Sequence, residues 1–447
     1  MSLNDLPDEL LDDVLNYIDP SPEGPGFHGA AKDDNEIDGF PALLSLNMVS
    51  KRFRRLTEPR IYNAYSHTHG QDGLRRLLRT LVRRPDLAAA VRRVDMSEAP
   101  FDPPKLPPAE HVDELVAAAR PLPIDSHERF LDALKDGDEH AEATLLLLLC
   151  HNLRALAVDV DHPSETTHLS ALFHAAIRAQ SPPHPSSATP TPLAALTSLS
   201  IINTGLTLPR TLLNTALTLP SLRHLHITNL GHDPYPSPWP APPPPSPLSH
   251  LTLHNTSTWR DDVATLAARC AALSSLAIHM GPSNARFPHP ALAAILRRHA
   301  PSLEHLSLDL AQWTAFNAEL GDRPRLPPLR FAAAGPLPRL RVLEVAGALL
   351  VGDGDGDGGP RVAVLVAEVP GSVEVLRVVG APAGCAEYLR EVGERCRGGG
   401  WPRMRRVEVL REAGGGAQVG EEVLERLRPG YAEAGVVLVW GRLEVER

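Results

Sequence analysis

One pattern recurs along the last two thirds of the chain: apolar, two variable residues, apolar, one variable residue, apolar. Nine segments follow it, and they begin at Leu153, Leu196, Leu222, Leu248, Leu273, Leu303, Leu340, Val373 and Met404. VRRVDM, which begins at Val91, reads as an earlier member of the series. The nine starts are 43, 26, 26, 25, 30, 37, 33 and 31 residues apart. So many recurrences indicate an internal structural repeat.

The end of each repeat alternates apolar and polar residues, as in Leu251, Thr252 and Leu253. This period of two is typical of a short, half-buried strand. The segments between the strands favour helices, for example residues 260–273 and 290–303. One strand and one helix per unit predict an α/β fold, a right-handed solenoid with a parallel sheet.

These units resemble leucine-rich repeats over residues 151–447. The Asn that normally follows the strand in that family is matched only by Asn203, Asn229 and Asn255, and the repeat length is irregular. A Pro-rich segment, residues 231–247, interrupts the series and is either a ligand for SH3-like or WW-like domains or, as we favour, an inserted loop. The Gly/Asp run 352–359 partly matches a dinucleotide-binding loop and a calcium loop, but a low-complexity loop fits better.

Two leucine-rich segments precede the repeats: LPDELLDDVLNYI, from Leu6 to Ile18, and a second one from Phe40 to Tyr62. Pro7 suits a first helical turn, and the acids after it complement the helix dipole. Further on, Ser50 is a good helix N-cap, and Pro59 is expected to end the helix that follows. Three helices in about 60 residues make too small a core to bury all this apolar surface. Part of it is therefore expected to bind a partner.

LPDELLDDVL followed by LLSLNMVSKRFRRL resembles the F-box motif, and the trailing EPRIY is similar to fungal members. The likeness covers about residues 4–62, with a longer gap between its two blocks than the family usually shows. It implies an N-terminal three-helix F-box that docks onto the Skp-type subunit of a Skp/cullin/F-box ubiquitin ligase. The docking residues it implies are Leu6, Pro7, Glu9, Leu10, Val14, Leu15, Leu44, Leu46, Val49, Ser50, Lys51 and Phe53. The alternative is that these residues form only the core of a helical domain.

The strand alternation also predicts which side chains project from the sheet face that the helices do not cover. Histidines are frequent there, and they are candidate substrate-binding residues: His224, His226, His250, His254, His279 and His305. Such a group could titrate near neutral pH or hold a metal ion, although scattered surface histidines are the simpler interpretation. Neither HExxH nor CxxC is present, so we predict no metal site.

Composition narrows the function classes. The 447 residues carry a net charge of −10, which disfavours a nucleic-acid binder. Residues 1–40 hold eleven acids and one base, whereas residues 41–84 hold ten bases and two acids. We expect that basic run to be a solvated helical face. Four scattered cysteines, an acidic N-terminus and no long apolar run predict a cytoplasmic or nuclear protein that does not enter membranes.

The sequence therefore predicts an F-box domain at residues 1–62, a helical connector at residues 63–150 and a repeat domain at residues 151–447. The expected function is a substrate receptor that binds a Skp-type adaptor, through it a cullin, and an unknown protein substrate. No catalytic motif or cofactor is expected. The alternative is a non-catalytic repeat scaffold whose N-terminal helices act as a cap.

Overall fold

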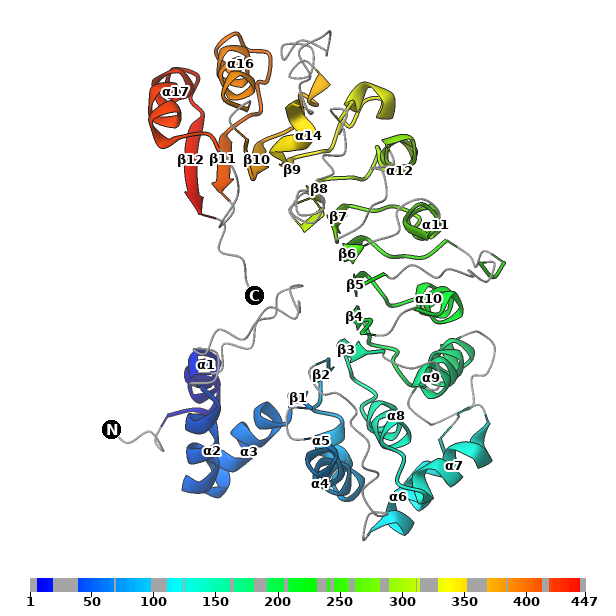
Figure 1. Ribbon diagram of the computed structural model, residues 1–447. Helices are drawn as coiled ribbons and strands as arrows, with labels where there is room; N and C mark the ends of the chain where they lie inside the picture. The colour runs from blue at the N-terminus through cyan, green and yellow to red at the C-terminus, as the bar shows by residue number, and fades with distance from the viewer. Residues whose placement is uncertain are drawn as a thin grey trace. The chain divides into compact units, whose positions relative to one another are not determined.

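The computed structural model describes residues 6–18, 39–67, 70–97, 111–122, 124, 126–160, 165–180, 191–204, 208–230, 239–241, 245–256, 262–281, 289–310, 312–313, 329–351, 368–382, 385–411 and 418–442. In these residues helices alternate with the twelve strands of a parallel sheet, and the strand order follows the sequence from β1 to β12 (Figure 1). The predicted α/β class with a parallel sheet is confirmed, and the alternation is consistent with a solenoid.

The chain divides into two compact units. The first comprises residues 1–226, 235–246 and 447, and the second comprises residues 227–234 and 247–446. The expected boundaries at residues 62 and 150 both fall inside the first unit.

The first unit holds the N-terminal helices and the first strands. Its helices are α1 (Asp8–Ile18), α2 (Gly39–Val49), α3 (Lys51–Ile61), α4 (Gly70–Arg83), α5 (Pro85–Ala88), α6 (Val112–Ala119), α7 (His127–Lys135), α8 (Glu139–Leu149), α9 (Glu165–Gln180) and α10 (Arg210–Leu217). Its strands are β1 (Ala64–Ser66), β2 (Arg93–Met96), β3 (Ala155–Asp159) and β4 (Ser198–Ile202), and the division falls inside β5 (His224–Thr228). Helices α8, α9 and α10 lie on one side of these strands (Figure 1).

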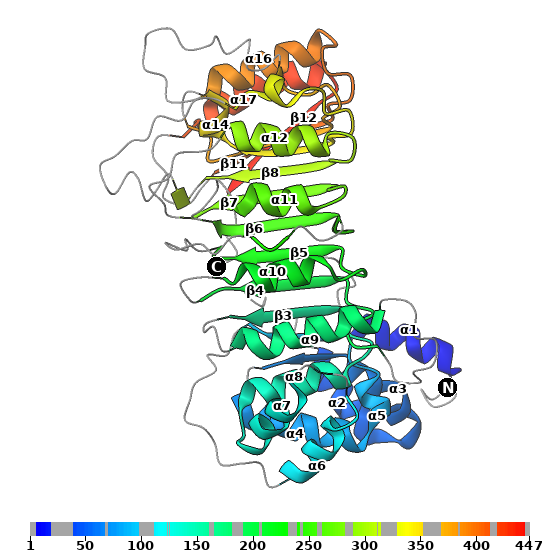
Figure 2. The ribbon, with the colours of Figure 1, turned by 90° about the vertical axis from the view of Figure 1, so that its right-hand side faces the viewer.

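The second unit continues the alternation. Its strands are β6 (His250–Thr256), β7 (Ser275–Met280), β8 (His305–Asp309), β9 (Val342–Ala346), β10 (Val375–Val379), β11 (Arg406–Arg411) and β12 (Val437–Arg442). Its helices are α11 (Ala264–Arg269), α12 (His289–His299), the 3-10 helix η4 (Phe331–Ala334), α14 (Gly347–Val351), α16 (Cys385–Arg397) and α17 (Glu421–Glu433). Figure 2 shows β6, β7 and β8 side by side, with α11 and α12 across one face, and β9 pairs with β8.

The core lies between the strands and these helices. Leu251, Leu276, Leu306 and Leu343 stand opposite one another in neighbouring strands, and each is at most 1% exposed. Fully burying such a side chain stabilises the fold by about 1.5–3 kcal/mol. One repeat alone would leave its leucine without neighbours on either side, so the repeats stabilise one another.

The recurring apolar pattern predicted strand positions well. Each of the ten segments leads into a strand that begins two residues after the segment starts, from β2 through β11. The pattern missed β1 and β12. Strand β1 has three residues, too few to show an alternation, and β12 has an unbroken apolar start, VLVW.

Asn229 directly follows β5, and Asn255 lies in the last part of β6. Asn229 and Asn255 have positive φ angles of 59° and 50°, a conformation that Asn tolerates better than most residues. Asn255 Nδ2 donates a hydrogen bond to Asn229 Oδ1. Gly281 comes 26 residues after Asn255, and a Cβ atom there would lie 1.9 Å from Asn255 Oδ1. Glycine is therefore the residue that fits beside this pair.

The prediction that Pro59 ends the third helix is wrong, because α3 continues to Ile61 and Tyr62 is its C-cap. Pro59 lacks the N–H that would bond the carbonyl oxygen four residues earlier, so α3 loses one hydrogen bond there and ends two residues later. Ser50 is the N-cap, as expected, and its Oγ accepts a hydrogen bond from the Phe53 amide at 3.2 Å.

Several predicted segments lie outside the described residues. These are the gap between the two N-terminal blocks (19–38), most of the Pro-rich segment (231–238 and 242–244) and the Gly/Asp run (352–359). All four cysteines are described; they are buried free thiols. Burial raises the pKa of Cys150, Cys270 and Cys385 to about 12, so these thiols stay protonated and unreactive near neutral pH.

Candidate functional site

Helices α1 and α2 carry most of the large exposed hydrophobic side chains that the structure describes. Of the eight large hydrophobic side chains that are exposed among the described residues, seven lie on these helices: Leu10, Val14, Tyr17, Phe40, Leu44, Met48 and Val49. Tyr17 is 91% exposed and Met48 is 76% exposed. Single exposed apolar residues are ordinary, but a concentration of this kind marks an interaction surface.

Helix geometry explains how each helix presents these side chains. Leu10, Val14 and Tyr17 are spaced i, i+4 and i+7, so they share one face of α1. Phe40, Leu44 and Met48 are spaced i, i+4 and i+8, so they form a similar row on α2. The buried faces are different: Leu11 and Leu15 of α1 and Leu43 of α2 are at most 3% exposed.

The structure separates the predicted docking residues into three groups. Pro7, Glu9, Leu10, Val14, Leu44, Val49 and Lys51 are exposed, and Leu6, Leu46 and Ser50 are half-buried. Leu15 and Phe53 are 1% and 4% exposed. These two side chains lie in the core, as the alternative interpretation expects, and a docking role for them stays a prediction.

Three exposed residues were missing from the predicted docking set: Tyr17, Phe40 and Met48. The spacing rule could have found them, since each extends a row that already contains a predicted docking residue. Tyr17 follows Leu10 and Val14, and the other two flank Leu44.

Ion pairs connect α1 to α3. Arg52 Nε donates to Asp8 Oδ1 at 2.7 Å, and Arg55 pairs with the other oxygen of the same carboxylate. Arg60 pairs with Asp12 Oδ1 at 3.2 Å. The hydrogen bond from Arg52, helped by the charge of both arginines, lowers the pKa of the Asp8 carboxyl.

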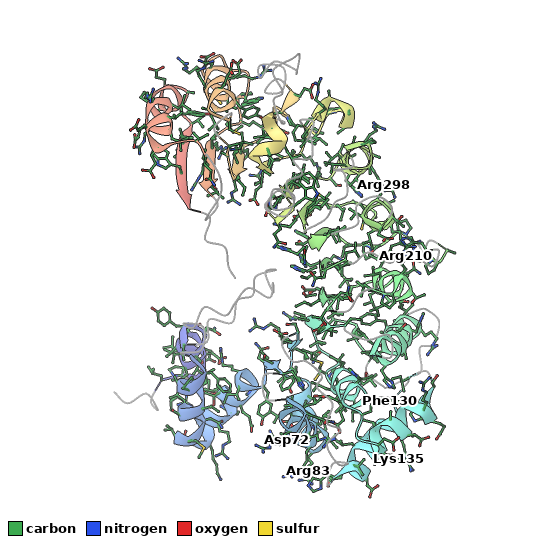
Figure 3. All side chains as sticks on the ribbon, in the orientation of Figure 1. Asp72, Arg83, Phe130, Lys135, Arg210 and Arg298 are labelled. Carbon is green, nitrogen blue, oxygen red and sulfur yellow. The ribbon has the colours of Figure 1, made fainter. Side chains whose placement is uncertain are left out.

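The basic run is not simply a solvated face. Six of its arginines pair with carboxylates of neighbouring elements: Arg52, Arg55, Arg60, Arg75, Arg83 and Arg84. Arg83 of α4, for example, pairs with Glu114 of α6 at 2.7 Å (Figure 3). These arginines therefore link the helices of the first unit.

The histidines predicted on the sheet face are half-buried there. His224 and His226 belong to β5, in the first unit. In the second unit the His254 and His279 rings stack, with centroids 4.0 Å apart, and His279 Nδ1 lies 3.4 Å from Asp309 Oδ2. His305 Nε2 is buried without a hydrogen-bond partner, and burial lowers the pKa of this imidazole.

These contacts do not build a metal centre. Within the described parts of the chain, no group of three or more His, Cys, Asp or Glu side chains could hold a metal ion. His250 instead contacts Ser249 Oγ through Nδ1 at 2.9 Å. The histidines of the second unit are therefore polar surface that a binding partner could contact.

A row of paired charges crosses the next strands of the same face. Ser307 Oγ donates to Glu344 at 2.9 Å, Arg377 contacts Glu344 at 3.4 Å and Glu408 at 2.7 Å, and Arg406 contacts Glu408 at 2.6 Å. Ser307, Glu344, Arg377 and Glu408 stand in register on β8 to β11. Each charge in this row has a partner of opposite sign, so these contacts serve to connect neighbouring strands.

A polar network joins β1 and α8 in the first unit. Tyr65 Oη lies 3.0 Å from His67 Nδ1, and His67 Nε2 lies 2.9 Å from Glu139. Burial, with a smaller effect of the Glu139 charge, raises the Tyr65 pKa well above its ordinary value. A phenol held in its neutral form is a poor nucleophile, so this chain of contacts suits packing rather than catalysis.

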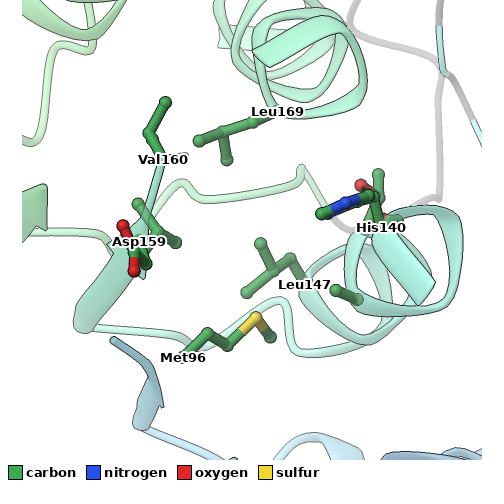
Figure 4. A pocket seen from close by; sticks show the side chains of 9 residues that line it. Met96, His140, Leu147, Asp159, Val160 and Leu169 are labelled. Carbon is green, nitrogen blue, oxygen red and sulfur yellow. Dashed lines mark hydrogen bonds between the residues drawn. The ribbon is translucent and has the colours of Figure 1, made fainter. Parts of the chain in front are cut away.

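A small cavity lies between β2, β3, α8 and α9 and is lined by Met96, His140, Leu147, Asp159 and Leu169, among others (Figure 4). Its volume is about 40 Å³. That is room for about one or two water molecules, whereas substrate pockets measure about 300–1,000 Å³. A groove of about 470 Å³ beside α12 and η4 is large enough, but Arg297 is the one charged residue that lines it.

Comparison with known proteins adds no family. No protein-family model matches the sequence, and no curated protein is significantly similar to it. Among the helices that the structure describes, none combines the length and apolar character needed to cross a lipid bilayer.

Proposed function

We propose that this protein is a substrate-recognition adaptor of a Skp/cullin/F-box type of ubiquitin ligase. Helices α1 to α3 would be its F-box, the exposed apolar rows would bind the Skp-type adaptor, and the repeats would bind a protein substrate. The protein would catalyse nothing itself and would hold its substrate near a ubiquitin-charged enzyme.

One observation carries this proposal. Seven of the eight large exposed hydrophobic side chains among the described residues lie on two short N-terminal helices. Leu11, Leu15 and Leu43 of these helices, together with Phe53 of α3, already supply the core of the three-helix unit. The side chains of the outward rows are each at least 42% exposed, and burial by a partner would account for them.

The alternative, a scaffold with a helical cap, predicts a different surface. A cap covers the sheet end with its apolar side and turns its polar side to water. In α1 and α2 the apolar residues face outward as well as inward. The outward rows therefore favour a surface that binds a partner over a simple cap.

The test is co-purification of the full chain with a tagged Skp-type adaptor. The test variant combines Leu10→Ala, Met48→Ala and Val49→Ala, because all three side chains are exposed and their loss should leave the fold intact. If docking buries them, their truncation should cost about 3–5 kcal/mol, which weakens binding by about 10²- to 10⁴-fold. Val437→Ala, an exposed valine of the second unit, is the matched control.

A variant that folds like the wild type but loses the adaptor would support the proposal. The scaffold hypothesis would replace it if the wild type holds no adaptor, and more so if removing residues 1–62 lowers the melting temperature of the repeats. Leu15→Ala is unsuited to this assay, because Leu15 is 1% exposed and its truncation disturbs the helices themselves.

A further inference from the structure

The opposite charges of the first two segments meet in the fold. Residues 1–40 are acidic and residues 41–84 are basic. Asp8 of α1 forms ion pairs with Arg52 and Arg55 of α3, and Asp12 forms one with Arg60. Arg60 also donates a hydrogen bond to the Asp12 carbonyl oxygen at 3.2 Å. We call these five residues the ionic clamp: Asp8, Asp12, Arg52, Arg55 and Arg60.

Helix α1 has few other attachments. It is 11 residues long, and Leu11 and Leu15 are the side chains of α1 that are buried. A free helix of this length is marginal in water, because too few hydrogen bonds offset the cost of nucleation. Besides these two leucines, the clamp supplies polar contacts that fix α1 on α3.

The clamp also sets the rotation of α1 about its axis. Asp8 and Asp12 are four residues apart and share one face, which is turned to α3 by the arginines. Leu10, Val14 and Tyr17 then lie on a different face, which the structure leaves exposed. If α1 rotated or detached, this apolar row would no longer stand in a fixed position.

We propose that the ionic clamp is the device that positions the docking row of α1, so that adaptor binding depends on charge pairs that are themselves outside the docking row. This inference rests on the proposed function. Arg52, Arg55 and Arg60 are positioning residues, and the docking affinity should respond to ionic strength through them.

Hydrogen exchange of the full chain tests the clamp without any adaptor. Deuterium uptake of residues 8–18 should become about threefold to tenfold faster between 50 mM and 500 mM NaCl, because salt screens partly exposed ion pairs. Asp8→Ala with Asp12→Ala should give fast uptake already at 50 mM, although alanine favours helix formation. Asp13→Ala is the control, since Asp13 is an exposed aspartate of α1 that pairs with no described residue.

The exchange result can overturn the clamp directly. Uptake in the Asp8/Asp12 variant that equals the Asp13 control would show that the ion pairs do not hold α1. Exchanging one pair, Asp12→Arg with Arg60→Asp, should restore slow uptake relative to either single change. A merely structural need for one of these residues would not give such a rescue.

Adaptor affinity then tests the positioning role. The Asp8/Asp12 variant should bind the adaptor about threefold to tenfold more weakly, and the Arg60 exchange should recover the loss. Unchanged affinity in a variant whose α1 exchanges fast would refute positioning. A wild-type chain with a salt-sensitive α1 but no adaptor binding would refute the proposed function while the clamp itself stands.

Discussion

Gly281→Ala probes the step from one repeat to the next in the second unit. A Cβ atom on Gly281 would lie 1.9 Å from Asn255 Oδ1 and 2.9 Å from the Asn255 carbonyl carbon. The side-chain oxygen can swing away, but Asn255 Nδ2 then loses its hydrogen bond to Asn229. The carbonyl carbon belongs to the backbone, so the end of β6 must also shift.

The expected cost follows from these two contacts. Loss of the side-chain hydrogen bond costs about 1 kcal/mol, and forcing a methyl group against backbone costs about 1–3 kcal/mol. The lower chain entropy of alanine in the unfolded state returns about 0.4–1 kcal/mol. We therefore expect Gly281→Ala to lower the free energy of unfolding by about 1–3 kcal/mol, measured by urea denaturation with circular dichroism.

Two further variants decide whether the reasoning is right. Gly371→Ala is the control, because a Cβ there meets nothing within 4 Å and its φ angle is not positive; it should leave stability unchanged or slightly raised. Adding Asn255→Gly to Gly281→Ala removes the side-chain part of the clash and keeps a residue that tolerates a positive φ, so the double variant should be more stable than additivity predicts. A Gly281→Ala protein as stable as the wild type would refute the account.

Three more outcomes are expected. Leu15→Ala should lower stability by about 2–4 kcal/mol because its side chain is 1% exposed, whereas Leu10→Ala, at 49% exposed, should change it by less than about 0.5 kcal/mol; equal effects in thermal melts would contradict the assigned faces. His299 accepts a hydrogen bond from the Leu273 amide, and burial lowers the pKa of its imidazole. Below pH 6.5 the unfolded chain therefore binds a proton that the folded chain does not, and the free energy of unfolding should fall as the pH drops. His299→Gln should flatten the slope of stability against pH between pH 7 and 5, and an unchanged slope would argue against this role of His299. Glu142→Ala should cost about 3 kcal/mol in urea denaturation, since it leaves a mostly buried arginine without its carboxylate, and a loss under 1 kcal/mol would show that the pair contributes little.

The N-terminal helices show where prediction from sequence stopped. The start of α1 at Asp8, just after Pro7, and the N-cap Ser50 were predictable, because capping depends on residues within one helical turn. The inward and outward leucines were not, since a helix with apolar residues on two faces gives no sign of which face its neighbours cover. Leu10 and Leu11 are adjacent in the chain, yet one is exposed and the other is 1% exposed.

The ion pairs between helices could not be predicted from the sequence either. The acidic and basic segments were visible as composition, but Asp8 and Arg52 are 44 residues apart and meet only when α1 lies against α3. A solvated basic face and a set of interhelical ion pairs have the same composition. Only the packing of α1, α4 and α6 against their neighbours decides between them.

The sequence by itself determined the strands β2 to β11 and their inward side chains, because a period of two is a local property of the chain and each repeat states it again. Tertiary structure alone decided which N-terminal leucines form the core and which arginines pair with α1. It also decided that position 281, beside Asn255, must be a glycine. Each of these depends on the shape and charge of a neighbour that is distant in sequence, and such contacts exist only after the elements have packed.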